Sequence, residues 1–172
     1  MKLNEKSVVL VGLMGVGKSR IGIELAKYLK MPFFDSDSEI ERAAGLTVQE
    51  IFQKFGEHEF RQGEKKVIIR LLSGQPIVLA TGGGAFMQED VRKTTKEKAI
   101  SIWLKASLET LLERTSRNQK RPLLMGVDRE EKLKELMLAR NPIYETADIA
   151  MDTDGFSPRD MARSIVAELE KR

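Results

Sequence analysis

Residues 8–20 read VVLVGLMGVGKSR, a short apolar run that leads into Gly-x-x-x-x-Gly-Lys-Ser at residues 12–19. This pattern is typical of a phosphate-binding loop. Its glycines let successive backbone N–H groups curl around phosphate oxygens, Lys18 reaches the β- and γ-phosphates, and the Ser19 hydroxyl ligates Mg²⁺. The apolar run predicts a strand before the loop, and Ile21, Leu25, Tyr28 and Leu29 predict the apolar face of a helix after it. The stretch therefore predicts an α/β protein that binds a nucleoside triphosphate at a helix N-terminus.

Length and composition predict one globular domain. The chain has 172 residues, of which 41% are hydrophobic and 32% are charged. No apolar stretch approaches the roughly 20 residues that span a bilayer, and the first residues carry no cleavage-site pattern, so we expect a cytoplasmic protein with no membrane partner. Because there is no cysteine, disulfides and thiolate metal sites are excluded.

The charge pattern favours a small anionic ligand over nucleic acid. The formal net charge is +3, and the charges of both signs are interleaved along the chain. The densest basic segment, residues 114–121, holds four cations among eight residues but no aromatic side chain. Nucleic-acid binders usually gather cations and aromatics on one face, so we expect no nucleic-acid partner and interpret this segment as a local anion site.

Apolar runs alternate with helical periodicity along the whole chain, which predicts an α/β sandwich with a mainly parallel sheet. The predicted strands are residues 7–11, 33–34, 77–80, 99–104 and 149–151. Six helices are predicted. They run from residue 21 onward, from the Thr47 capping box to Gly56, over residues 60–71, over residues 108–112, from Asp128 onward and from Ser157-Pro158 onward.

The position of the acidic residues narrows the class of phosphate-loop protein. The strand at residues 77–80 ends in Thr81 and glycines without the metal-binding Asp that many such proteins carry there, and no Asn-Lys pair supports a regulatory GTPase. Asp35 and Asp37 follow the second strand instead, and in an extended segment both would point to one side, toward metal and acceptor. Alternatively, they form an N-cap cluster for a helix that starts near Ser38. The lack of another acid favours the first interpretation.

Residues 78–86, VLATGGGAF, place three consecutive glycines directly after a predicted strand. Each glycine gives up side-chain packing and adds backbone entropy to the unfolded chain. We therefore expect other groups to approach this backbone so closely that a side chain would collide with them.

Six motifs in order, GLMGVGKS, FFDSDSEIE, GEHEFRQGE, TGGG, RPLL and RNPIYETA, resemble those of the shikimate kinases over essentially the whole chain. The resemblance implies a three-layer α/β/α sandwich with a five-stranded parallel sheet in the order 2-3-1-4-5. It implies a single domain over residues 1–172, with substrate-binding helices at about 36–64 and a lid at about 115–127. The implied reaction is phosphorylation of the 3-hydroxyl of shikimate by ATP and Mg²⁺, in the pathway to chorismate and aromatic amino acids, by a monomer.

The resemblance also assigns roles to individual residues. The catalytic residues it implies are Lys18, Asp37 as candidate general base, and Arg121, which would reach from the lid onto the transferring phosphate. The implied metal ligands are Ser19 and Asp35. The implied ATP-binding residues are Gly12, Gly15, Val16, Gly17, Lys18, Ser19, Arg20, Arg121 and the adenine-sandwiching pair Arg114 and Pro158. The implied shikimate-binding residues are Asp37, the glycines Gly82, Gly83 and Gly84 along the ring, and Arg61 and Arg140 at the carboxylate.

The residues alone leave alternatives open. Arginine suits bidentate carboxylate recognition, so two of them would select an acidic polyol; however, Arg61 and Arg140 could equally form surface ion pairs on helices. Arg121 could be a solvated loop residue. For the function, the alternatives are a kinase of gluconate, a nucleoside monophosphate or another small molecule, and a non-catalytic nucleotide-binding regulator. The presence of Lys18, Asp37 and Arg121 favours catalysis.

Overall fold

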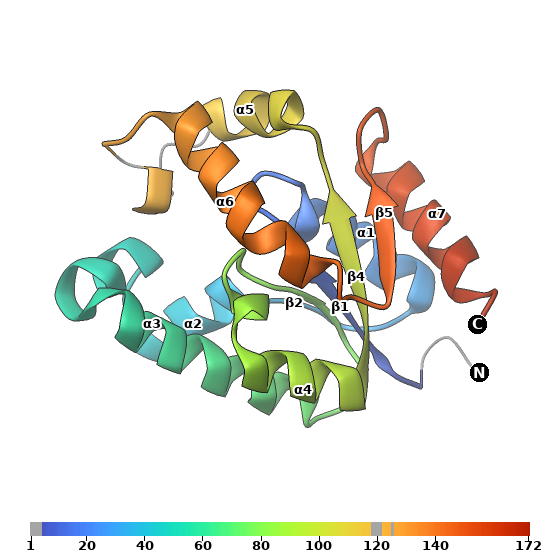
Figure 1. Ribbon diagram of the computed structural model, residues 1–172. Coiled ribbons are helices and arrows are strands. Elements are labelled where there is room, and N and C mark those ends of the chain that lie inside the picture. The colour runs from blue at the N-terminus through green and yellow to red at the C-terminus, as the bar shows by residue number, and fades with distance from the viewer. Residues whose placement is uncertain (1–4, 118–121, 125) are drawn as a thin grey trace.

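A computed structural model describes residues 5–117, 122–124 and 126–172, and its centre is a five-stranded parallel sheet (Figure 1). The strand order is β2-β3-β1-β4-β5, which confirms the predicted topology. The strands are β1 (Ser7–Val11), β2 (Phe33–Asp35), β3 (Val78–Ala80), β4 (Ala99–Lys105) and β5 (Ile149–Asp152). The central strand β1 is buried along its whole length, as expected for a parallel sheet with both faces covered.

Helices cover both faces of this sheet and make the expected three layers (Figure 1). Helices α1 and α7 pack together on one face, and α4 and α6 lie over the other. The helices are α1 (Lys18–Leu29), α2 (Ser36–Ala44), α3 (Val48–Leu72), α4 (Glu89–Lys98), α5 (Leu108–Ser116), α6 (Arg129–Tyr144) and α7 (Pro158–Leu169), with 3₁₀ turns at Ala85–Met87 and Pro122–Leu124. The predicted caps Thr47, Asp128 and Ser157 are confirmed, since each side chain accepts a hydrogen bond from a first-turn backbone N–H.

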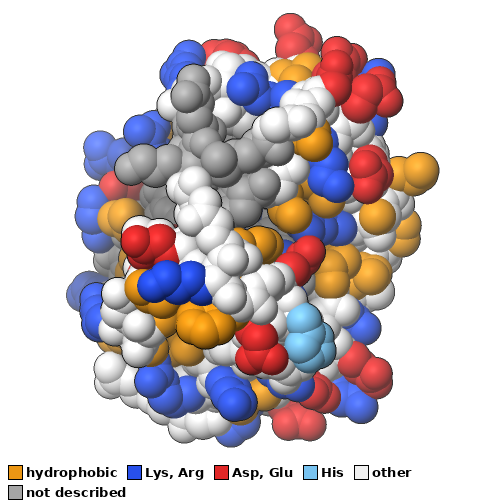
Figure 2. All heavy atoms as spheres, turned by 90° about the vertical axis from the view of Figure 1, so that its left-hand side faces the viewer, with side chains coloured by type: hydrophobic (Ala, Val, Ile, Leu, Met, Phe, Trp, Pro, Cys, Tyr) orange, Lys and Arg blue, Asp and Glu red, His pale blue; other side chains and the backbone are white. Residues whose placement is uncertain are grey.

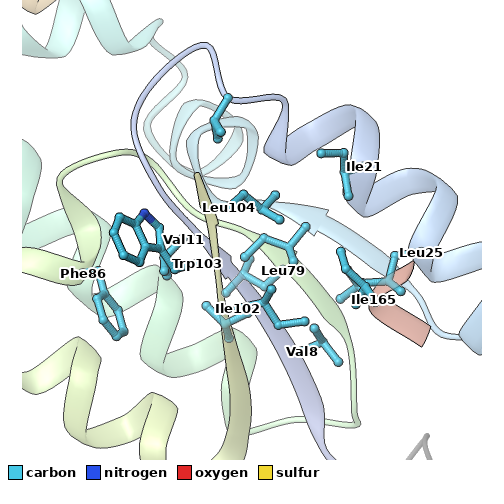
Figure 3. Close-up of a cluster of buried hydrophobic side chains, with 14 of the residues drawn as sticks. Val8, Val11, Ile21, Leu25, Leu79, Phe86, Ile102, Trp103, Leu104 and Ile165 are labelled. Atoms are coloured by element: carbon cyan, nitrogen blue, oxygen red, sulfur yellow. The ribbon is translucent and has the colours of Figure 1, made fainter. Parts of the chain in front are cut away.

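The core is formed where apolar side chains of the sheet meet these two helical layers (Figure 3). Ile21, Leu25 and Ile165 lie on one side of the strands, whereas Phe86 and Trp103 lie on the other. Leu25 and Ile165 are fully buried. Burying a large aliphatic side chain stabilises the fold by about 1.5–3 kcal/mol, so this core holds the strand ends, and the loops that follow them, in place.

Helix α4 was not among the predicted elements. Its sequence, EDVRKTTKEK, contains a single apolar residue, Val91, which is fully buried. One apolar residue cannot generate a helical repeat, so the hydrophobic pattern carries no signal here. The helix forms because Val91 and Thr95, one turn apart, both face the protein interior.

Gly56, with a φ of 82° and a ψ of 173°, leaves helical geometry and divides α3 into two helices at a kink, which agrees with the predicted stop. One further expectation is wrong. Tyr28 was expected on the apolar face of α1, yet it is exposed, and its hydroxyl oxygen accepts hydrogen bonds from Arg159 (3.3 Å) and Arg163 (2.8 Å) of α7. Tyr28 is therefore a polar link between the two helices.

The surface seen from the left of Figure 1 mixes charges of both signs (Figure 2). Blue and red side chains are interspersed there, with small hydrophobic areas between them. Among the described residues, no helix has the length and apolar character needed to cross a membrane.

Candidate active site

The phosphate-binding loop connects β1 to the N-terminus of α1. Gly12, Gly15 and Gly17 have φ values of 143°, 84° and 100°, a left-handed region that favours glycine. Packing adds a second constraint, since a Cβ at Gly12 would lie 2.5 Å from the carbonyl oxygen of Leu104. Backbone conformation therefore favours glycine at all three positions, and at Gly12 the adjacent strand β4 also excludes a side chain.

Lys18, the first residue of α1, is buried beneath this loop with 9% of its surface exposed. Its ammonium group donates hydrogen bonds to the carbonyl oxygens of Gly12 (2.6 Å) and Leu13 (2.9 Å). The side chain thus keeps a positive charge at the loop that would receive the phosphates. Arg20, two residues further along α1, is exposed.

Asp35 links the phosphate loop to α2 by using both carboxylate oxygens. The hydroxyl of Ser19 donates to Oδ2 at 2.5 Å, while Oδ1 accepts from the backbone N–H groups of Asp37 (3.0 Å) and Ser38 (3.2 Å). Asp35 is therefore compatible with both interpretations, because it caps a helix and also lies beside the predicted metal ligand Ser19. The expected extended geometry is wrong, because Asp37 belongs to the first turn of the helix that Asp35 caps.

A cavity of about 330 Å³ lies next to Ser19 and Asp35. It brings together every predicted shikimate-binding residue and both predicted metal ligands, which come from five different elements and the segment after β3. Its lining residues are Met14, Ser19, Asp35, Asp37, Glu41, Val48, Phe52, Phe60, Arg61, Glu64, Gly82, Gly83, Gly84, Leu123 and Arg140. Charged side chains make up one part of this lining, and Val48, Phe52 and Phe60 make up an apolar part. This combination suits a small molecule with a hydrocarbon ring and polar substituents.

The three glycines after β3 form the part of this lining where charged side chains touch bare backbone. A Cβ at Gly82 would lie 2.8 Å from Oε2 of Glu64 and 2.9 Å from Oδ1 of Asp37. A Cβ at Gly83 would lie 3.1 Å from Nη1 of Arg140, and one at Gly84 would lie 2.5 Å from Cζ of Arg61. These glycines therefore leave room for the carboxylates and guanidinium groups of the protein itself.

Arg61 is held in the cavity wall by Glu64, a residue the sequence pattern assigned only to a helical repeat. Nη1 of Arg61 lies 2.9 Å from Oε1 of Glu64, which also accepts a hydrogen bond from Gln88 (3.1 Å). Glu64 is fully buried, and this burial raises its pKa although the charge of Arg61 acts in the opposite direction. The sequence feature that could have indicated this role is the presence of a glutamate on the otherwise apolar helix face of Phe60 and Val67.

Arg140, on α6, also lines the cavity and is only 7% exposed. Within the described part of the chain, its Nη1 atom is a buried donor that has no hydrogen-bond partner. Arg61 is 18% exposed. This burial differs from that of an ordinary surface ion pair, and a buried guanidinium donor facing a cavity is suited to an anionic ligand.

The predicted adenine-binding pair, Arg114 and Pro158, is not part of this cavity lining. Arg114 donates a hydrogen bond to the carbonyl oxygen of Val16 in the phosphate loop (2.8 Å), while Pro158, at the start of α7, lines a separate groove with Tyr28. Their pairing around adenine stays a prediction. Arg121 and part of the predicted lid at residues 115–127 lie outside the described residues, but Leu123 of that segment lines the cavity.

Comparison with known proteins relates this site to one family. The family model described as "Shikimate kinase" matches residues 14–170. The chain is 52% identical over 149 residues to a shikimate kinase of Bradyrhizobium diazoefficiens, with 87% of this chain and 72% of the relative covered. It is 46% identical over 166 residues to a shikimate kinase of Zymomonas mobilis, with coverage of 96% and 94%.

Solved structures agree with this relationship. Shikimate kinase from Acinetobacter baumannii in complex with shikimate superposes with a TM-score of 0.94 at 41% identity, covering 96% of this chain and 93% of that one. A gluconokinase from Sinorhizobium meliloti, covering 97% and 93%, has a TM-score of 0.66 at 18% identity, which shows a shared fold and nothing more.

Proposed function

The chain belongs to the shikimate kinase family and phosphorylates shikimate with ATP, and we propose that the acceptor is the 3-hydroxyl group, bound in the cavity beside the phosphate loop. The observation that carries this proposal is the arrangement of charges around one cavity. Arg61 and Arg140 supply cations at one part of its wall, and Asp37 supplies a carboxylate near Ser19 of the phosphate loop.

The two arginines explain the choice of an acidic acceptor. A carboxylate placed between Arg61 and Arg140 would satisfy the buried donor Nη1 of Arg140 with a charge-assisted hydrogen bond. Within α3, Glu64 accepts a hydrogen bond from Nη1 of Arg61 (2.9 Å) and Glu57 accepts one from Nη2 (3.3 Å), so the Arg61 guanidinium is fixed in the cavity wall. A neutral polyol would leave the buried Nη1 donor of Arg140 without a hydrogen-bond partner, so it should bind poorly.

The same arrangement defines the transfer step. With the carboxylate at the arginines, the ring lies over Gly82–Gly84, and a ring hydroxyl reaches Asp37. The hydroxyl oxygen attacks the γ-phosphorus of ATP, the bond to the bridging oxygen of ADP breaks, and the hydroxyl proton passes to Asp37. Lys18 stabilises the negative charge on the phosphate oxygens. Because such transition states are loose, positioning contributes more than deprotonation.

A divalent metal accompanies ATP in this chemistry, and we propose that it is Mg²⁺ held at Ser19 and Asp35. The hydroxyl and the carboxylate lie 2.5 Å apart beside the phosphate loop, and both are hard oxygen donors, which Mg²⁺ prefers. A small number of protein ligands leaves positions for phosphate oxygens and water, as is usual for this ion. When bound, the metal neutralises charge on the β- and γ-phosphates.

An acceptor panel tests the function. Release of ADP should be measured with ATP and MgCl₂ and, in turn, shikimate, gluconate, a nucleoside monophosphate and a neutral cyclitol. We expect turnover with shikimate alone, and NMR of the product should place the phosphate on the 3-oxygen. Turnover with gluconate in place of shikimate would refute the acceptor assignment, and tight ATP binding without turnover of any acceptor would indicate a nucleotide-binding regulator.

We also propose that the enzyme acts as a monomer, because a single chain already supplies the phosphate loop, Asp37 and both arginines of the proposed site. Sedimentation velocity at the assay concentration tests this, and a dimer whose dissociation abolishes activity would contradict it.

A further inference from the structure

Tyr144 is a fully buried residue at the end of α6 whose hydroxyl donates a hydrogen bond to the carbonyl oxygen of Gly83. It follows Arg140 by four residues, so both side chains lie on the same face of the helix. One helix face thus carries the Arg140 guanidinium, which lines the cavity, and the Tyr144 hydroxyl, which donates to the glycine segment of the same lining. Tyr144 belongs to the RNPIYETA motif, but the sequence pattern alone assigns it no role.

The glycine segment depends on such contacts, because glycines have no side chains to fix their conformation. The described tethers are few. Thr81 donates its backbone N–H to Leu10 of β1 (3.2 Å), Gly82 donates to the buried hydroxyl of Ser36 on α2 (3.0 Å), and Gly83 accepts from Tyr144. Tyr144 is therefore the tether that joins this segment to α6.

Gly83 has neighbours on two sides, so a shift of its backbone would affect both of them. A Cβ there would lie 3.1 Å from Nη1 of Arg140 and 3.5 Å from the backbone nitrogen of Met14 in the phosphate loop. Arg140 thus packs directly on the Gly83 backbone. If Gly83 shifts, Arg140 loses the surface that supports its guanidinium.

The chemistry of Tyr144 suits a permanent donor. Its desolvation raises the pKa of the phenol to about 12, against the smaller opposing effects of Arg140 and Arg61. The hydroxyl therefore keeps its proton throughout the neutral range, and its hydrogen bond does not titrate where the enzyme works. Tyr144 cannot act as a general base there.

We propose that Tyr144 is a positioning residue for shikimate: its hydroxyl locks Gly83 beneath Arg140 and so fixes the distance between the carboxylate-binding guanidinium and the phosphate loop. This inference rests on the proposed function, because it assigns Arg140 to the shikimate carboxylate. Tyr144 itself is fully buried and is not part of the cavity lining.

The variant Tyr144→Phe removes the hydroxyl and keeps the ring. The loss of one buried hydrogen bond of this kind should raise the KM for shikimate by about three- to tenfold, with the KM for ATP changed by less than about twofold. Thr95→Val is the matched control: it removes another buried hydroxyl, which donates to Val91 within α4 (2.7 Å), while keeping the side-chain shape. It should leave both KM values unchanged even where the melting temperature falls.

Coupling to Arg140 separates positioning from general destabilisation. Shikimate affinity should be measured by calorimetry for Tyr144→Phe, Arg140→Lys and the double variant. If Tyr144 acts through Arg140, the double variant binds less than about twofold more weakly than Arg140→Lys alone, because the two losses are not additive. Additive losses, equal rises in both KM values, or an unchanged shikimate KM would overturn the role. Wild-type enzyme that does not phosphorylate shikimate would instead refute the proposed function, and this role with it.

Discussion

The substitution Gly84→Ala isolates the contact between the glycine segment and Arg61. Gly84 has a φ of −93°, so alanine fits the backbone without strain. Its methyl group, however, would lie 2.5 Å from Cζ and 2.6 Å from Nη1 of Arg61. Since ordinary contacts between such atoms begin at about 3.5 Å, the guanidinium must move by about 1 Å. That movement pulls Nη1 away from Glu64, at present 2.9 Å distant.

The magnitude follows from the sensitivity of oriented binding to displacement. A misplacement of about 1 Å in a positioning group costs up to about 100-fold, so we expect the KM for shikimate to rise by about 10- to 100-fold, which is about 1.4–2.7 kcal/mol. The KM for ATP should change by less than about twofold. Steady-state ADP release, with each substrate varied while the other is saturating, measures both quantities.

Gly63→Ala is the matched control, because Gly63 lies in the same helix as Arg61 and a Cβ there would meet nothing within 4 Å. This variant should keep both KM values and gain about 0.5–1 kcal/mol of stability from the higher helix propensity of alanine. A shikimate KM for Gly84→Ala within about twofold of wild type would show that Arg61 moves aside without cost. Equal losses for both substrates would mean that the glycines serve only as a structural turn.

Three further substitutions test the remaining charges. Lys18→Met should abolish turnover, because it removes the charge that neutralises the transferring phosphate; a near-normal kcat would refute this role. Asp37→Asn should lower kcat more than it weakens shikimate binding, and a rise in KM alone would make Asp37 only a positioning group. Burial raises the pKa of Glu64 above its ordinary value of 4.5, so the folded protein binds this proton more readily than the unfolded chain. Wild type should therefore lose stability relative to Glu64→Gln as the pH rises from about 4.5 through the raised pKa. A difference in melting temperature between the two proteins that stays constant over this pH range would contradict a raised pKa of Glu64.

The strands and most of the helices were predictable because their signals are local. The β-branched run before the phosphate loop, the capping box at Thr47 and the Ser157-Pro158 start each depend on a few neighbouring residues. Helix α4 escaped prediction because its single apolar residue makes no repeat. The residues predicted to bind shikimate and the metal line one cavity, although Asp37 reaches it from a helical turn and not from an extended segment.

The phosphate loop, the alternation of strands and helices, and the family relationship can all be read from local patterns in the chain, since conformational preference and short spacing encode these features directly. Which charges meet depends on tertiary packing. Arg61 of α3, Arg140 of α6 and the glycines after β3 lie up to 79 residues apart, and packing alone brings them to one cavity. The same burial gives Glu64 its raised pKa and makes Tyr144 a fixed donor, because desolvation exists only once the chain has folded around these groups.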